Sequence, residues 1–149
     1  MKRILLAAGT LALLLSATTV RVSAQAPTAP AGLYVTDLQI APSLPTVGNT
    51  FTFTASFLNT ATGEQNMKWR VLIYRAAAAQ KSYSDTTWLA SSFPVGASVK
   101  LSDGDWYLPL GTPCDYYFAR VVWMDSNNQS IPFLTPDGRV FEKGFNTCP

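Results

Sequence analysis

The chain has 149 residues, with 11 lysines and arginines, nine aspartates and glutamates, and no histidine. Histidine is the commonest general base and the commonest zinc ligand, so its absence excludes Ser-His-Asp and Cys-His nucleophilic catalysis. Without the three basic residues of the N-terminal leader described next, eight basic residues face nine acidic ones and the net charge is −1. That balance excludes nucleic-acid binding through a basic surface.

Residues 1–26 predict a signal peptide. Lys2 and Arg3 precede an apolar run over residues 4–15, and Ala24-Gln25-Ala26 is a small-x-small site for signal peptidase. We expect the mature chain to start at Pro27, or at Gln25 if cleavage follows Ala24. An uncleaved anchor is the alternative, but the apolar run is shorter than the ~20 residues that span a bilayer. The sequence therefore predicts a secreted, extracellular or periplasmic protein that has no stable membrane insertion after signal removal.

The mature chain is predicted to be one domain. Residues 27–32 begin Pro-Thr-Ala-Pro-Ala, which is typical of a short extended linker, and residues 33–149 are enough for a single core. Alternating apolar and polar residues predict strands, clearest over 50–59 and 68–75. The full expected set is 33–40, 50–59, 68–75, 86–93, 98–108, 116–125 and 140–145. These short strands, without an amphipathic helix, predict an all-β fold, an antiparallel β-sandwich of about seven strands.

Cys114 and Cys148 are the two cysteines of the chain. In an exported protein an even count indicates a structural disulfide, with a free pair or an intermolecular bridge as alternatives. If the two cysteines face each other across the last two strands, Arg120 lies opposite Glu142, Val122 opposite Val140 and Lys143 beside Ala119. Residues 124–138 would then form a protruding excursion.

The run Leu108–Tyr117 is similar to the crossing between the fifth and sixth strands of immunoglobulin-like and fibronectin-III-like domains. It holds a leucine, a corner containing proline and glycine, and a following tyrosine. The opening also resembles bacterial CARDB-type, cell-adhesion-related domains, in Thr36–Ser43, Val47-Gly48, Phe51–Thr54 and Leu58–Thr60. The resemblance implies an immunoglobulin-like extracellular β-sandwich.

The outer face of the strands 68–75 and 116–125 is the predicted binding surface. Their opposite rows are too apolar to face water, which leaves a mixed patch outside with the arginine and tyrosine typical of interface hot spots: Arg70, Leu72, Tyr74, Phe118, Arg120 and Val122. The alternative is that a loop or edge segment covers this face.

Three aromatic residues in weaker segments, Tyr83, Trp88 and Trp106, are candidates for stacking on sugars or on a protein, with core packing as the alternative. Asp103-Gly104-Asp105 and the turn 125–128 carry oxygen ligands of the kind calcium prefers, but too few for a full site, so turn chemistry explains them. No metal site, cofactor or catalytic residue is predicted.

We expect an exported, single-domain, non-enzymatic module that works in binding or adhesion, or as a structural part of the cell surface. Its partner would be a protein or glycan at the cell surface. The alternatives are a carbohydrate-binding module that uses exposed tryptophan or tyrosine, and an accessory subunit of a secreted hydrolase.

Overall fold

The computed structural model describes residues 32–43, 48–78, 82–102, 106–107 and 111–147. These residues form ten strands and one 3-10 turn, Ala76–Ala78. The strands are β1 Leu33–Ala41, β2 Thr50–Asn59, β3 Gln65–Arg75, β4 Ser82–Asp85, β5 Leu89–Phe93, β6 Gly96–Leu101, β7 Trp106–Tyr107, β8 Tyr116–Met124, β9 Ser130–Pro132 and β10 Glu142–Asn146. All strand pairs are antiparallel, so the predicted all-β, antiparallel fold is confirmed. Within the described ranges there is no helix of the length and apolarity that a membrane span needs.

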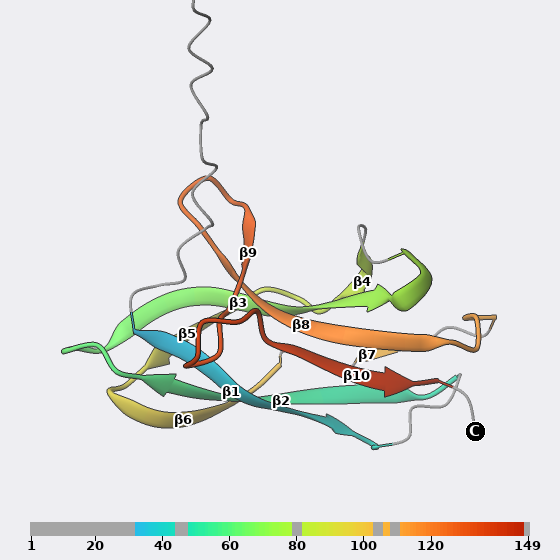
Figure 1. Cartoon of the computed structure of the whole chain (residues 1–149), viewed down its shortest axis with the longest axis horizontal. Coiled ribbons are helices and arrows are strands. Elements are labelled where there is room, and N and C mark those ends of the chain that lie inside the picture. The colour runs from blue at the N-terminus through green and yellow to red at the C-terminus, as the bar shows by residue number, and fades with distance from the viewer. Residues whose placement is uncertain (1–31, 44–47, 79–81, 103–105, 108–110, 148–149) are drawn as a thin grey trace, which may run out of the picture.

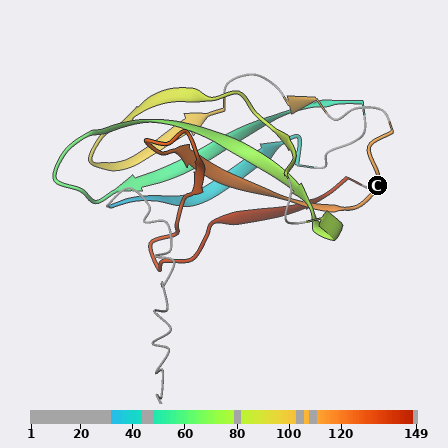
Figure 2. The same cartoon turned by 90° about the horizontal axis from the view of Figure 1, so that it is seen from above.

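The strands form two sheets that lie as two layers (Figures 1 and 2). The four-stranded sheet has the order β1-β2-β6, with β7 also on β2. The six-stranded sheet has the order β10-β8-β3-β4, with β5 on β3 and β9 on β8. Three pairs of short strands share one edge of a longer partner: β4 and β5 on β3, β6 and β7 on β2, β9 and β10 on β8. The two short strands of each pair lie end to end and occupy one strand position, which we call a strand line. The ten strands therefore occupy seven strand lines across the two sheets.

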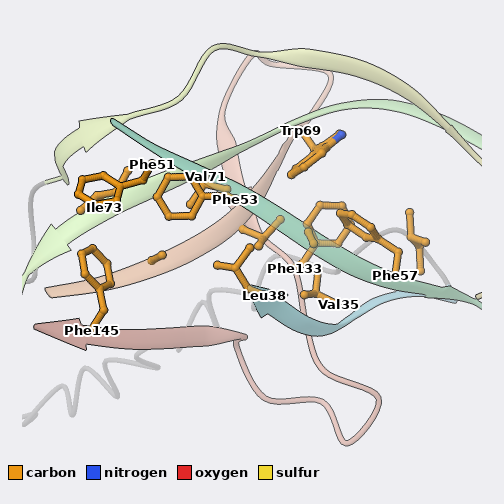
Figure 3. Close-up of a cluster of buried hydrophobic side chains, with 14 of the residues drawn as sticks. Val35, Leu38, Phe51, Phe53, Phe57, Trp69, Val71, Ile73, Phe133 and Phe145 are labelled. Atoms are coloured by element: carbon orange, nitrogen blue, oxygen red, sulfur yellow. The ribbon is translucent and has the colours of Figure 1, made fainter. Parts of the chain in front are cut away.

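The core lies between the two sheets, and Figure 3 shows its side chains meeting there. β2 contributes Phe51, Phe53, Ala55 and Phe57, all on one face, as period-2 alternation requires. The inward rows predicted for the other layer are also found in this core: Trp69, Val71, Ile73, Tyr117, Ala119 and Val121 are buried, and Trp123 packs against them. Phe57 contacts Trp69, Phe93 and Phe133 edge-on, with ring centroids 5.3, 4.7 and 5.3 Å apart.

The predicted register between β8 and β10 is confirmed in part. Arg120 lies opposite Glu142 and Ala119 opposite Lys143, and Lys143 is exposed. The prediction that Val122 faces Val140 is wrong, because β9 already occupies that part of the β8 edge and sets Pro132 opposite Val122. The hairpin after Met124 thus stays on the sheet, and the chain leaves it only beyond Phe133.

Residues 133–141 form a small hairpin inserted between β9 and β10. The Phe133 N–H donates to the Val121 carbonyl at 2.9 Å, and the Phe141 N–H donates to the Phe133 carbonyl at 3.1 Å. The Leu134 carbonyl accepts from the Val35 N–H of β1 at 3.0 Å, which ties the insertion to the other sheet. Because the insertion also places the fully buried Phe133 ring in the core, it joins the two layers rather than protruding from them.

The start of β8 is fixed by a corner of hydrogen bonds. The Tyr117 hydroxyl donates to the Pro113 carbonyl at 3.0 Å, and Arg75 Nε donates to Asp115 Oδ2 at 2.6 Å. The Thr147 N–H donates to the Asp115 carbonyl at 3.2 Å. The Arg75 guanidinium, followed by the Tyr116 N–H, lowers the pKa of Asp115 below its ordinary value. This corner joins the ends of β3, β8 and β10.

Cys114 lies in the same corner and is not a free thiol. Cys148 lies outside the described residues, so its pairing with Cys114 stays a prediction.

We predict that Phe133→Ala lowers the free energy of unfolding by about 3 kcal/mol, the usual cost of emptying a buried phenylalanine site. The measurement is denaturant unfolding, with Val140→Ala as the control because Val140 belongs to the same insertion but is 45% exposed. The control should change stability by less than about 0.5 kcal/mol. Equal small losses in both variants would contradict a core role for the insertion.

We predict that Asp115→Asn lowers the melting temperature at neutral pH and much less near pH 2. A carboxylate whose folded pKa is lowered stabilises the fold above its unfolded pKa of about 4, and that stability is lost as the pH falls through the folded value. Thermal unfolding across this pH range tests it, and Arg75→Gln should give the same profile. A loss of melting temperature that is the same at neutral pH and near pH 2 would contradict this role of the Asp115 carboxylate.

Candidate binding surface

The six residues predicted for the binding surface lie side by side on β3 and β8. The register pairs Arg70 with Val122, Leu72 with Arg120, and Tyr74 with Phe118. All six belong to the rows that alternate with the core residues, so they share the outer face of the six-stranded sheet. We call these six residues the outer face.

The middle of the outer face is less accessible than predicted. Leu72 and Val122 are buried, and Tyr74 is 9% exposed. These three residues form a second apolar cluster, against which Trp88 and Phe118 pack. The alternative of a covering segment is therefore correct for the centre of the face, because Trp88 follows β4 and packs back over the sheet. Arg70, Phe118 and Arg120 remain partly exposed.

Arg70 is held between an aromatic ring and an acid. Its guanidinium carbon lies 4.4 Å from the centre of the Trp88 ring, and its Nη1 pairs with Asp85. Nη2 also donates to the Ser130 hydroxyl of β9 at 3.3 Å. Asp85, Trp88 and Ser130 thus hold the planar Arg70 guanidinium group in place at this end of the outer face.

Arg120 repeats this arrangement two residues further along the sheet. Its guanidinium carbon lies 4.7 Å from the centre of the Tyr74 ring and 5.8 Å from that of Phe118, and it pairs with Glu142. Tyr74 and Phe118 stack with their centroids 5.3 Å apart and an angle of 12° between the rings. Both arginines are therefore neutralised by acids and ordered by aromatic rings.

Tyr116 extends the outer face, although the sequence analysis did not select it. It precedes Phe118 by two residues and so points to the same side, where it is 49% exposed. A Cβ on Gly144 of β10 would overlap the Tyr116 hydroxyl, so the ring lies against bare backbone. The signal was available in the sequence: the predicted register already set Gly144 opposite Phe118, diagonal to Tyr116.

The surface is hollowed beyond Arg70, where β3 pairs with β5. A depression of about 370 Å³ is lined by residues of β3 and β5: Asn66, Met67, Lys68, Ala90, Ser91 and Ser92. The β5 residues here have small side chains, and the lining is mostly apolar, with the Asn66 amide, the Lys68 ammonium group and two serine hydroxyls among its residues.

The remaining candidates are distributed over the molecule. Trp88 is partly buried against the outer face rather than free. Tyr83 lies in β4 and Trp106 in β7, but their side chains lie outside the described part of the structure. In the turn after β8, Asp125 Oδ1 accepts from the backbone N–H groups of Asn127 and Gln129 at 2.9 and 2.7 Å, which is turn chemistry. Residues 103–105 are not described, and no cluster of three metal-ligating side chains occurs in the ranges that are.

No protein-family model matches the sequence, and no curated protein matches it. Among solved structures, the Pseudomonas fluorescens alkylpurine DNA glycosylase AlkC, bound to DNA containing an abasic site analog, is similar with a TM-score of 0.50 and 12% sequence identity. The similarity covers 77% of this chain and 30% of that chain, so the chain spans less than a third of that protein. At this identity the similarity describes the fold alone.

We predict that Gly144→Ala displaces the Tyr116 ring into solvent and lowers the free energy of unfolding by about 1 kcal/mol. The control is Gly63→Ala, because a Cβ at Gly63 would meet no atom within 4 Å. Adding Tyr116→Ala to Gly144→Ala should not add a second loss, since the ring has already left. Denaturant unfolding measures these three variants and the unmodified chain, and an effect of Gly144→Ala no larger than that of Gly63→Ala would refute the contact.

Proposed function

We propose that this chain is an exported, immunoglobulin-like binding module without catalytic activity, and that it binds a protein partner through Tyr116 and the partly exposed residues of the outer face, Arg70, Phe118 and Arg120. The observation that carries the proposal is the pair of neutralised arginines, Arg70 and Arg120, each ordered against an aromatic ring on one side of one sheet.

The fold supports the immunoglobulin-like part of the proposal. Seven strand lines in two antiparallel sheets, β1, β2 and β6–β7 against the rest, fit a fibronectin-III-like sandwich. Trp69 of β3 is buried in the core, as the inward tryptophan of such domains is. The Tyr117 hydroxyl bonds to the carbonyl of Pro113, a residue upstream of β8, which is the arrangement of a tyrosine corner.

Physical chemistry favours a protein as the partner at this surface. Arginine, tyrosine and tryptophan dominate interface hot spots, since they combine large apolar area with directional donors. Side chains that are already ordered lose less conformational entropy on binding. Asp85 and Glu142 balance the two guanidinium charges, so the partner need not be acidic. The signal peptide expected from residues 1–26 would place this partner outside the cytoplasm, at the cell surface.

A glycan is the second candidate, and the hollow beside Arg70 favours it. Asn66, Lys68 and Ser92 are among its lining residues and could hydrogen-bond sugar hydroxyls there. The protein partner, by contrast, could be a secreted hydrolase, with this chain as its accessory subunit.

We predict that a photo-crosslinking residue at Tyr116 gives protein adducts in cells that export the chain. The matched control is the same residue at Tyr107, which is 47% exposed on the other sheet. Adducts at position 116 but not at 107 support the proposal. Equal adducts at both positions, or none at 116, would count against a protein partner on this face.

A glycan array run in parallel separates the second candidate. Binding that is lost in Ser92→Trp, which fills the hollow, and kept in Tyr116→Ser would assign a glycan to the hollow instead. No glycan binding together with adducts at 116 keeps the protein partner.

A further inference from the structure

The edge strand β6 of the four-stranded sheet exposes a row of apolar side chains. Ala97, Val99 and Leu101 alternate with Ser98 and Lys100, and Val99 and Leu101 are 64% and 58% exposed. Their neighbours on the same side of β2 are Leu58, Ser56 and Thr54, none of which is charged. This side of the sheet is therefore uncharged at its edge, with apolar side chains along β6.

The backbone of the same three residues points away from the sheet. The Ser102 N–H donates to the Phe53 carbonyl of β2 at 2.8 Å. Because backbone direction alternates along a strand, Ser98 and Lys100 also face β2, and Ala97, Val99 and Leu101 face the open edge. Within the described residues β6 pairs with β2 alone, so this edge is open to a further strand.

The other sheet edges carry features that discourage pairing. β1 has a register shift between Val35 and Asp37, β10 carries the charged Glu142 and Lys143, and the line of β4 and β5 is interrupted between Asp85 and Leu89. Bulges, charges and short segments are the usual protection of edge strands. β6 shares the break in its line, between Leu101 and Trp106, but its one charged residue, Lys100, turns its ammonium nitrogen to the inner side, where it lies 5.7 Å from the centre of the Phe93 ring.

We propose that two copies of this chain pair through antiparallel β6 strands about a two-fold axis at Val99. In this register Val99 faces Val99 of the second copy, and Ala97 faces Leu101. The backbone groups that face the open edge then bond to each other, and the two small sheets become one continuous sheet.

The sequence of β6 complements itself in this register. Reversal exchanges Ala97 with Leu101 and Ser98 with Lys100, so apolar residues meet apolar ones on the outer side. Each Lys100 faces Ser98 of the other copy, and the two lysines avoid direct opposition. An interface of one short strand is small, so the dimer should be weak and should form only at high concentration.

Charge substitutions at the axis give a sharp test in the full exported chain. We expect Val99→Lys and Val99→Glu each to weaken self-association at least about tenfold, because each sets like charges opposite each other. An equimolar mixture of the two variants should restore dimers. Val99 is largely exposed, so both variants should keep the monomer fold, which circular dichroism checks. The control pair is Val140→Lys and Val140→Glu, which should dimerise like the unmodified chain when sedimentation is measured over a concentration series.

Amide hydrogen exchange supplies a second measurement. At high concentration the amides of Ala97, Val99 and Leu101 should become protected, while those of Ser98 and Lys100 are protected at every concentration. A monomer at all concentrations would overturn the proposal. So would a dimer that survives both Val99 variants, or protection without this alternation.

Discussion

The contacts of the Phe57 ring are the interaction on which the rest of the structure depends. Phe57 belongs to the four-stranded sheet, whereas Trp69 and Phe93 come from the other layer and Phe133 from the insertion beside it. Phe93 ends β5, and the chain then crosses to β6 in the opposite sheet. One ring thus holds together both layers, the crossing and the insertion. Edge-to-face contacts of this kind are directional, so they set the relative position of the layers as well as burying area.

Because the inner rows pack in this core, the binding that we propose uses the outer sides of the two sheets, and these differ in chemistry. On the six-stranded sheet, rings support neutralised guanidinium groups, which suits a partner with mixed polar and apolar surface. On the four-stranded sheet, β6 offers uncharged side chains and open backbone groups, which suit another strand. The two surfaces lie on opposite layers, so self-pairing through β6 would leave the outer face of each copy accessible to its partner.

Most of what the sequence could predict came from the local alternation of apolar and polar residues. The strand 50–59 and the inward rows of β3 and β8 follow from period-2 patterns, since each side chain's direction depends only on its neighbours in the chain. β4 and β9 were missed, because strands of four and three residues are too short to establish a pattern. The burial of Leu72 and Val122 depends on Trp88, which packs over them. The change of register on β8 between β9 and β10 depends on the burial of Phe133 in the core. Both features depend on tertiary contacts between distant residues, so a local sequence pattern does not predict them.

The central claim is that the ring of Phe57 fixes the insertion to the core, and a double-mutant cycle tests it directly. Phe57→Leu, Phe133→Leu and the double variant keep both sites apolar while removing the edge-to-face contact, and denaturant unfolding gives the four free energies. We predict a coupling of about 0.5 to 1.5 kcal/mol between the two positions. Losses that add to within about 0.3 kcal/mol would mean that the insertion is buried independently of Phe57, and would contradict the account.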